Sequence, residues 1–312
     1  MVHCNKRGSE ALLGDCSHIF KYEQGGAAHL GGVLLSTLRN KPDGTFDLKE
    51  MESRIRGFDI HEPVTNLVAV ENTHNYCGGK VLPMTWLDEL ADLCKKHSIP
   101  IHMDGARLFN ACEYLGEKPS NVVKHCASVS VCFSKGLCAP AGSALAGSYH
   151  FIEQARRLRR MLGGAMRQVG VLAAPALVAL DEIVPLLGFD HKRAFRLAKV
   201  IEGLFLDSFA VDVENLHTNI VLVRISENSP LTSEVVLQRL MEVCQSETMN
   251  DCKTENNDGV IVRGTHFNDK TLRFILHHDI TDEDLWLAIM KITYVFKELD
   301  KNKQAAKKNQ II

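Results

Sequence analysis

Residues 128–147 read SVSVCFSKGLCAPAGSALAG. The alternating and then continuous apolar run at the start predicts a β-strand that ends at Lys135. A lysine is an unusual residue for the end of a buried strand, because its charge is rarely removed from water. The glycines, alanines and serines that follow leave room beside its side chain. The stretch therefore indicates a strand that carries a lysine to the edge of a sheet.

The segments before it repeat this pattern. The runs EALLGD (10–15), NLVAVENTHN (66–75) and IPIHMDGAR (99–107) each predict a short strand that ends in polar residues, the last at Asp104. Between them, TWLDELADLCKKHS (85–98) has apolar residues at helical spacing and ends in lysines, which suit a helix C-terminus. Strands alternating with helices predict an α/β domain with a large, mostly parallel mixed sheet.

After residue 147 the pattern changes. Residues 150–187 are mainly helical, with a break at Gly163 and Gly164, and residues 188–206 predict an amphipathic helix. Strand-like runs at 219–225 and 271–278 then enclose a helical run, which predicts a smaller α+β domain. We therefore expect a large α/β domain at 1–190, a bridging helix at 191–206, a small C-terminal domain at 207–299 and a charged tail at 300–312.

Composition excludes several classes of protein. A formal net charge of −2 gives no electrostatic basis for binding nucleic acid or an anionic membrane surface. We read no apolar run of the roughly 20 residues that a membrane span needs, and the start MVHCNKRGSE lacks the apolar core of a secretory signal. The ten cysteines form no CxxC pair and the histidines are scattered, so we expect no metal site and a cytoplasmic protein.

Asp104 and Lys135 suggest chemistry when they are taken together. Taken singly, Asp-Gly is a common turn and a lysine after a strand is ordinary. In open α/β sheets, however, ligands bind at the carboxyl ends of the strands, where both residues are predicted to lie. A lysine there can form a Schiff base with an aldehyde, and an aspartate can keep the ring nitrogen of a pyridine cofactor protonated. Their joint placement favours this interpretation.

Four motifs resemble one known family. SKGLCAPAGS (134–143), HMDGARLFNA (102–111), ENTHNYCGGKVLP (71–83) and GGAMRQVG (163–170) are similar to stretches of the low-specificity L-threonine aldolases. Those enzymes are homo-oligomers, dimers or tetramers, of the aspartate-aminotransferase fold, fold type I, and depend on pyridoxal 5'-phosphate. The resemblance extends from residue 3 to residue 281 and covers nearly the whole chain.

The resemblance implies a role for each matching residue. Lys135, in its setting beside Ser134, matches the Schiff-base lysine, and Asp104 matches the aspartate on the ring nitrogen. His18 matches the histidine stacked on the ring, and Arg107 matches an arginine beside the cofactor's ring oxygen and the substrate.

Further matches concern the substrate and the neighbouring subunit. His74 matches a histidine near the substrate's β-hydroxyl, and Arg273 matches the arginine that holds the substrate carboxylate. Arg160 and Arg167 match basic residues near the site, one of them reaching a neighbouring subunit's cofactor phosphate. Lys135, His74 and His18 are thus the expected catalytic residues.

The implied activity is cleavage of L-threonine or L-allo-threonine to glycine and acetaldehyde, in threonine catabolism and glycine biosynthesis. The family carries several dozen residues before the point that matches Met1, including a helix start that binds the cofactor phosphate. Losing two or three such hydrogen bonds would weaken cofactor binding by roughly 3–9 kcal/mol. One alternative is therefore a chain that lacks the cofactor and only associates with full-length subunits, and another is a different pyridoxal-phosphate-dependent amino-acid lyase. A second departure is Ala165, where the family has a third glycine.

Overall fold

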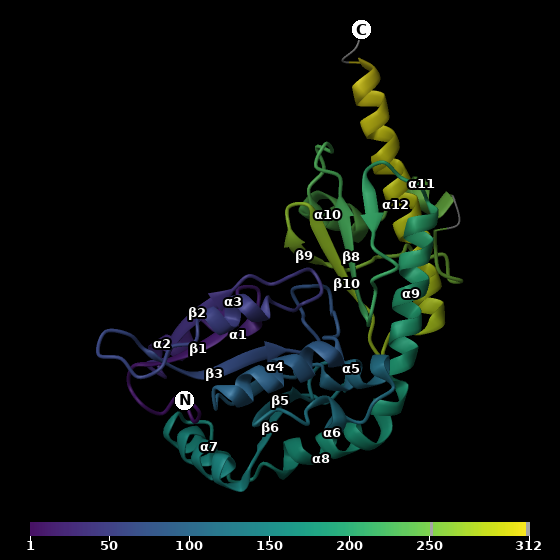
Figure 1. Cartoon of the computed structure of the whole chain (residues 1–312). Helices are drawn as coiled ribbons and strands as arrows, with labels where there is room; N and C mark the ends of the chain where they lie inside the picture. The colour runs from purple at the N-terminus through teal and green to yellow at the C-terminus, as the bar shows by residue number, and fades with distance from the viewer. Residues whose placement is uncertain (250–251, 310–312) are drawn as a thin grey trace. The chain divides into compact units, whose positions relative to one another are not determined.

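The structure, a computed structural model, describes the backbone of residues 1–249 and 252–309. The chain divides into two compact units, Met1–Gly188 and Phe189–Ile312 (Figure 1). Each unit has its own sheet and its own apolar core.

The first unit alternates strands and helices, as the sequence predicted. Its strands are β1 (Ser9–Gly14), β2 (Leu34–Leu38), β3 (Val64–Glu71), β4 (Ile101–Asp104), β5 (Ser128–Cys132) and β6 (Ser143–Gly147). Its helices are α1 (His18–Lys21), α2 (Gly26–His29), α3 (Leu48–Ser53), α4 (Met84–Lys96), α5 (Leu108–Leu115), α6 (Pro119–Val122), α7 (Tyr149–Met161) and α8 (Gly170–Val178). A π-helical turn η1 (Ala179–Ile183) and a 3-10 turn η2 (Val184–Leu186) continue from α8.

The first sheet has the strand order β2-β1-β3-β4-β5-β6. The pairs from β2 through to β5 are parallel, and β6 is antiparallel to β5. This arrangement confirms the predicted large, mostly parallel mixed sheet. Because the five parallel strands run in one direction, their carboxyl ends lie along one edge of the sheet.

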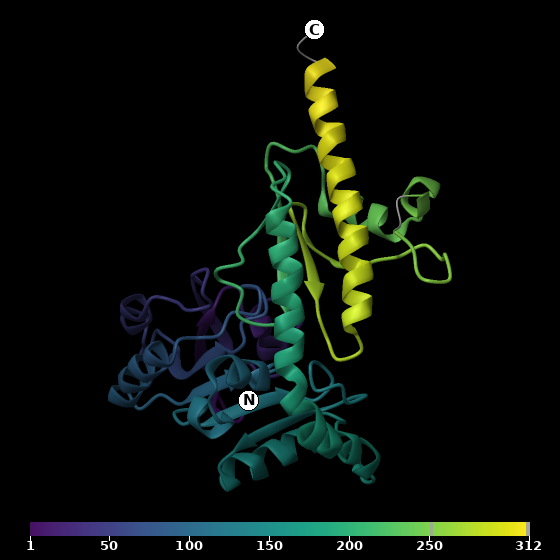
Figure 2. The same cartoon turned by 90° about the vertical axis from the view of Figure 1, so that its right-hand side faces the viewer.

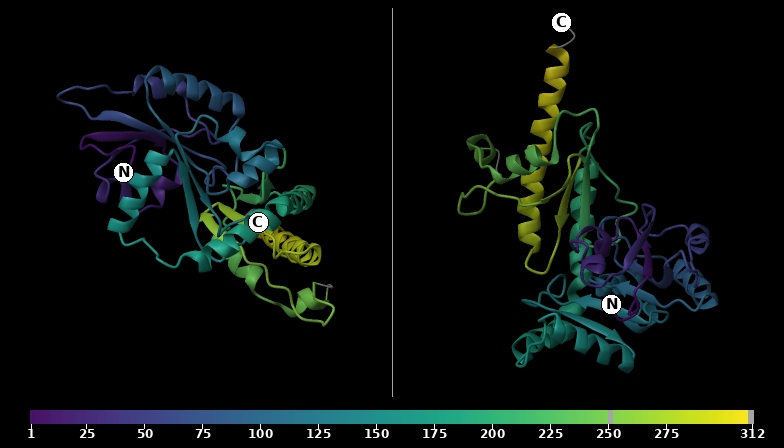
Figure 3. Two further views of the ribbon diagram at one scale, coloured as in Figure 1. Left: turned by 90° about the horizontal axis from the view of Figure 1, so that it is seen from below. Right: turned by 90° about the vertical axis from the view of Figure 1, so that its left-hand side faces the viewer.

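Helices α3, α4, α5 and α6 bury one face of this sheet. In α4, Leu87, Leu90 and Cys94 are buried at helical spacing, and the helix ends in Lys95 and Lys96 as predicted. They belong to a cluster that also contains apolar residues from the strands (Leu12, Leu38, Val68, Val70, Ile101, Met103, Val129). Helix α7 lies on the opposite side of the sheet (Figures 1 and 3). There the buried cluster is smaller and consists of Cys4, Ala11 and Val33.

Two details of the first unit differ from the sequence prediction. Strand β5 ends at Cys132, so Lys135 lies in the following loop rather than at the last strand position. Strand β6 follows from the small-residue run that we interpreted only as room beside the lysine. Its side chains are mostly exposed, so it carries no strong apolar alternation that would have revealed it.

The second unit is an α+β structure. Its strands are β7 (Phe209–Val211), β8 (Ile220–Ile225), β9 (Thr265–Asn268) and β10 (Thr271–Ile275), and they form an antiparallel sheet in the order β7-β8-β10-β9. Its helices are α9 (Leu187–Gly203), α10 (Ser233–Met241), α11 (Gln245–Met249) and α12 (Asp282–Asn309). Helices α9 and α12 lie side by side (Figure 2) and share one core, in which Phe209 and Phe296 stack with ring centroids 4.1 Å apart.

Two long helices differ from what the sequence predicted. Helix α12 continues through Asn309 where we expected a charged tail from residue 300, and residues 310–312 lie outside the described part. The helical stretch Gly170–Gly203 contains an 18-residue window of mean hydropathy 1.8, of which 17% is buried. By length and composition alone it is apolar enough to cross a membrane. Asp181 and Glu182 interrupt its apolar run, which is why we read no such run in the sequence.

Candidate active site

Four neighbouring strands deliver the predicted residues to one edge of the first sheet. His18 follows the end of β1, and His74 follows the end of β3. Asp104 is the last residue of β4, and Lys135 lies three residues beyond β5. Because β1, β3, β4 and β5 are adjacent and parallel, these side chains gather where open α/β sheets bind their ligands.

Asp104 is fixed by the turn that starts α5. Its carboxylate accepts a hydrogen bond of 3.1 Å from the backbone N–H of Ala106, and its side chain is half-buried. Arg107, at the start of the same helix, donates from Nη1 to Asn75 Oδ1 at 3.1 Å. This bond links the loop after β4 to the loop after β3. An aspartate and an arginine are thereby held at the end of β4, and the arginine is tied to the loop at the end of the neighbouring strand β3.

Lys135 lies in a closed loop between β5 and β6. The N–H of Phe133 donates to the carbonyl of Gly142 at 3.0 Å, which closes the loop at its base. Gly142 has φ 103°, a conformation that favours glycine. At Gly136, a Cβ would stand 3.1 Å from Asn110 Oδ1. The small residues after the lysine therefore serve a tight loop, while Ser134 is exposed and Lys135 is half-buried beside it.

His18 opens the short helix α1 and remains accessible. Its Nε2 lies 3.2 Å from Glu23 Oε1, and its ring centroid is 5.4 Å from that of Tyr22. Its side chain is 39% exposed, enough for a planar ligand to contact the imidazole. The backbone N–H of His18 donates to Glu71 Oε2 at 2.7 Å, so the position of the residue is set from β3.

Glu71 is a site residue that the sequence analysis did not single out. It is the last residue of β3, is 5% exposed and pairs in register with Asp104. Burial raises the pKa of its carboxyl to about 7, and the charge of Asp104 adds to this. Hydrogen bonds from the N–H groups of His18 and Asn75, and the charge of Lys135, act in the opposite direction. The signal was available, since an acid ends the buried run NLVAVE.

His74 is deeply buried rather than open. It is 1% exposed, and within the described structure neither of its ring nitrogens has a hydrogen-bond partner. Burial lowers the pKa of its imidazole to about 4, so the ring is neutral at pH 7. Gly44 packs against it so closely that a Cβ there would stand 2.8 Å from the Cβ of His74. Buried polar atoms usually have hydrogen-bond partners, so these two nitrogens are an exception in the described structure.

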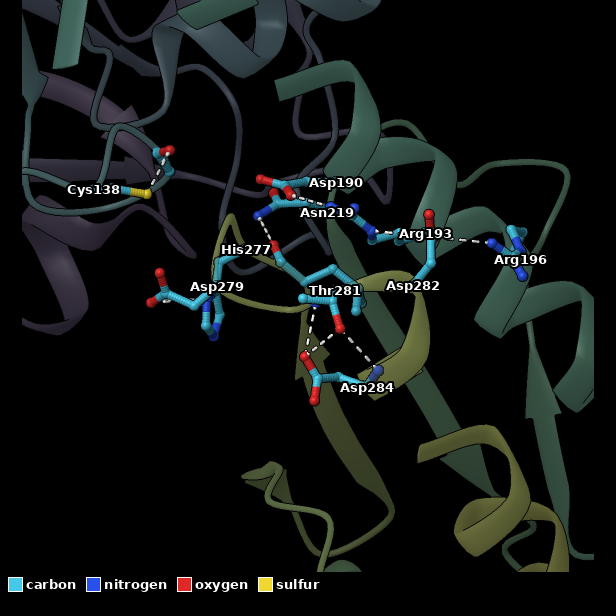
Figure 4. A network of polar contacts seen from close by, with 12 residues as sticks. Cys138, Asp190, Arg193, Arg196, Asn219, His277, Asp279, Thr281, Asp282 and Asp284 are labelled. Carbon is cyan, nitrogen blue, oxygen red and sulfur yellow. Dashed lines mark hydrogen bonds and ion pairs between the residues drawn. The ribbon is translucent and has the colours of Figure 1, made fainter. Parts of the chain in front are cut away.

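Of the three remaining predicted arginines, two belong to the first unit and one to the second. Arg160 is exposed in the last turn of α7, and Arg167 is exposed in the loop before α8. Arg273 lies on β10 opposite Leu222 of β8, and its role stays a prediction. Figure 4 shows how the end of that strand is secured: Asn219 Nδ2 donates to the carbonyl of Leu276 at 2.7 Å.

Comparison with known proteins identifies the family. Residues 1–228 match the model of a family described as beta-eliminating lyase. The chain is 42% identical over 289 residues to low-specificity L-threonine aldolase 1 of Arabidopsis thaliana, an alignment that covers 91% of this chain and 75% of that protein. The chain belongs to the beta-eliminating lyases, among the low-specificity L-threonine aldolases.

Solved structures of such lyases and their fold relatives support the architecture. The Leishmania major threonine aldolase superposes with a TM-score of 0.68 at 18% identity, over 96% of this chain and 80% of that one. A PLP-dependent aminotransferase from Streptococcus suis superposes with a TM-score of 0.66 at 16% identity, over 96% and 74% of the two chains. At these identities the likeness concerns the fold, which is the predicted pyridoxal-phosphate-dependent type.

The residues of this lyase fit the cofactor that its family implies. A primary amine, an acid and a guanidinium stand on adjacent strand ends, in Lys135, Asp104 and Arg107, and His18 offers an accessible ring. The buried ring nitrogens of His74 lack protein partners in the described structure. Among the described residues, no group of three or more His, Cys, Asp or Glu is arranged to hold a metal ion. The donor set therefore suits pyridoxal phosphate.

One departure from the family pattern has no structural penalty. Ala165 stands where the family has a third glycine, and it is not among the residues of positive φ, whereas the nearby Gly163 is, at 83°. An alanine that does not need φ above zero is tolerated or slightly stabilising.

Proposed function

We propose that this lyase cleaves L-threonine or L-allo-threonine into glycine and acetaldehyde with pyridoxal 5'-phosphate as cofactor. One observation carries the proposal: His18, His74, Asp104, Arg107 and Lys135 come from four adjacent strands and meet at the carboxyl edge of one sheet. The relatives' names state the same reaction class. Such an enzyme would consume threonine and supply glycine.

The cofactor, when bound, accepts the electron pair that is released as the Cα–Cβ bond breaks. Lys135 would hold it covalently, and Asp104 would keep its ring nitrogen protonated. Arg107, anchored by Asn75, would direct a guanidinium toward the ring oxygen and the substrate. His18 would cover one face of the ring, and Ser134 would contribute a hydroxyl beside the lysine.

Cleavage requires the β-hydroxyl proton to leave as the carbonyl of acetaldehyde forms, and a proton to reach Cα to give glycine. His74 would accept the first proton, because its ring is neutral at pH 7 and its nitrogens have no competing partner in the described structure. Arg273 would bind the substrate carboxylate through its planar, two-pronged guanidinium. The role of His74 is the part of the proposal that distinguishes an aldolase from a simple eliminating lyase.

A cofactor titration tests the proposal. Purified protein is titrated with pyridoxal phosphate, and the visible absorption band of the lysine-bound cofactor is followed. Lys135→Ala is the control. A saturable band that is absent in the variant, together with acetaldehyde release from threonine, supports the proposal. A folded protein with no band would contradict it and revive the alternative of a chain that only associates with complete subunits.

The type of reaction is tested separately at His74. His74→Asn should reduce threonine cleavage strongly while the cofactor band persists, because the variant keeps Lys135 and Asp104. A variant that cleaves threonine at the wild-type rate would show that His74 is not the base.

We also propose that the chain works as a homo-oligomer, a dimer or a tetramer. Apolar side chains are exposed along residues 161–178, among them Met161 at 67%, Val171 at 68% and Leu177 at 62%. A patch of this kind is typical of a protein interface. Arg160 and Arg167 lie in the same region, and one of them would reach the cofactor phosphate of the neighbouring subunit. We assign the apolar stretch to subunit contact rather than to a membrane.

Light scattering tests this assignment. Val171→Asp should lower the molar mass of the particle in solution toward that of one chain, 34.7 kDa. It should also weaken cofactor binding if sites are shared. An unchanged mass would contradict the interface. We expect small amino acids as ligands. Ten free cysteines suit a reducing compartment, so we propose the cytoplasm as the location of the protein.

A further inference from the structure

Glu71 is a buried acid at the candidate site to which the resemblance assigns no role. The strand that carries it, β3, runs between β1 and β4 in the sheet. Its carboxylate lies 5% exposed at the end of this central strand. A buried carboxylate is unfavourable unless specific donors satisfy it, so the identity of those donors shows what the residue does.

The two oxygens of Glu71 bind two different loops. Oε2 accepts the backbone N–H of His18 at 2.7 Å, in the loop after β1. Oε1 accepts the backbone N–H of Asn75 at 2.8 Å, in the loop after β3. Asn75 Oδ1 in turn accepts from Arg107 Nη1 at 3.1 Å, in the loop after β4. One carboxylate thus connects the strand-end loops that carry three predicted site residues: His18, His74 and Arg107.

The charges around Glu71 oppose one another. Asp104, its in-register neighbour on β4, disfavours the carboxylate, whereas Lys135 from the loop after β5 favours it. On the β1 and β3 sides the groups that feel its charge are the thiols of Cys16 and Cys77, whose pKa values burial raises and Glu71 raises further. The resulting pKa of Glu71, about 7, leaves the carboxylate substantially populated at neutral pH.

We propose that Glu71 is a positioning residue of the aldolase site, which holds the main chain of His18 and Asn75 so that the His18 imidazole and the Arg107 guanidinium keep their places at the cofactor. The inference rests on the proposed function for the identity of the cofactor. The two hydrogen bonds from the N–H groups of His18 and Asn75 to Glu71, which we call the clamp, are present in the chain without any ligand.

Two substitutions provide a matched pair. Glu71→Gln keeps the shape, but its amide N–H₂ faces one backbone N–H, so one of the two hydrogen bonds is lost. Glu10→Gln is the control, because Glu10 is also a buried glutamate of this sheet, 0% exposed. It sits near the start of β1, accepts from Thr65 Oγ1 at 2.6 Å and pairs with Arg56 at 3.4 Å. Its partners belong to no loop of the candidate site.

Hydrogen exchange of the cofactor-free protein is the first measurement. In Glu71→Gln at least one of the amides of His18 and Asn75 should exchange at least about tenfold faster than in the wild type, because its acceptor oxygen has been replaced by an amide N–H₂. In Glu10→Gln both amides should exchange at the wild-type rate. Unchanged exchange in Glu71→Gln, or equal acceleration in the control, overturns the proposal.

Kinetics then separate positioning from general stability. With saturating cofactor, Glu71→Gln should lower kcat for threonine about tenfold or more while KM changes less than about twofold, because misplaced groups act mainly on the reacting geometry. Faster exchange with wild-type kcat would make Glu71 merely structural and overturn the proposal. If the wild type cleaves no threonine, the proposed function fails, whereas the exchange result still decides whether the clamp exists.

A measurement on the wild type covers the case in which Glu71→Gln does not fold. The backbone amide resonances of His18 and Asn75 are followed by NMR as a function of pH. Both should shift with one common midpoint near neutrality as their shared acceptor gains a proton. Two unrelated midpoints, or no shift at Asn75, would overturn the proposal.

Discussion

Replacing His74 with leucine should make the protein more stable and less active. The imidazole is 1% exposed, and neither ring nitrogen has a partner in the described structure, so folding removes two polar atoms from water without compensation. An unsatisfied buried polar group costs about 1–3 kcal/mol. His74→Leu, of similar volume, should recover about that amount at pH 7.5.

The gain should increase on acidification. The imidazole has a pKa of about 4 in the folded chain against 6.5 in the unfolded one, so between these values the unfolded state binds more protons. The contribution of His74 to wild-type stability therefore falls as pH drops from 6.5 to 4, by about 3 kcal/mol at ~1.4 kcal/mol per pH unit. The leucine variant has no imidazole to titrate, so it lacks this pH-dependent loss of stability. Its advantage should reach about 4–6 kcal/mol at pH 4.

The assay is urea unfolding of both proteins without cofactor at several pH values, followed by threonine cleavage at pH 7.5. Loss of a general base should reduce cleavage by about 10²–10⁴-fold. His191→Leu is the control: burial also lowers the pKa of His191 to about 4, but it lies in the second unit. The stability advantage of His191→Leu over the wild type should likewise increase as pH falls, but this variant should cleave threonine at the wild-type rate. A His74→Leu advantage that does not change with pH would refute the reasoning.

Two further predictions concern stability. Ala165→Gly should lower the free energy of unfolding by about 0.4–1 kcal/mol, because the position has no positive φ to justify glycine; thermal unfolding measures it, and a stabilised variant would contradict it. Lys291→Met should destabilise by up to about 3–5 kcal/mol, because it removes one of the two cations, Lys291 and Arg239, that pair with the fully buried carboxylate of Glu247; urea unfolding measures it, and a change below ~1 kcal/mol would contradict it.

The sequence predicted best where local patterns and chemistry coincide. The strand ending at Asp104, the helix at 84–96 and the break after α7 all lie where periodicity and glycine placed them. Lys135 could be proposed as a site residue because a lysine contradicts the apolar pattern around it. The resemblance then supplied roles that no spacing could give, such as that of His18.

What the sequence did not predict depends on contacts distant along the chain. Strand β6 is mostly exposed, so its alternation is weak and only pairing with β5 defines it. Glu71 looks like an ordinary strand end until β1 and β4 are placed beside it and His18 donates to its carboxylate. The burial of His74 is likewise a tertiary property, set by the approach of Gly44.

Glu71 and His74 make opposite contributions to the pH dependence of stability. For Glu71 the pKa rises from 4.5 to about 7 on folding, so the folded state binds more protons in that window and stability falls as pH rises, by about 3 kcal/mol. For His74 the sign is reversed between pH 4 and 6.5, with a similar magnitude. The two contributions nearly cancel in the wild type. Glu71→Gln should therefore expose the His74 dependence, with stability rising with pH, and His74→Leu should expose the opposite slope. A pair of variants whose slopes have the same sign would show that these two groups do not carry the titration, because cancellation requires contributions of opposite sign from Glu71 and His74.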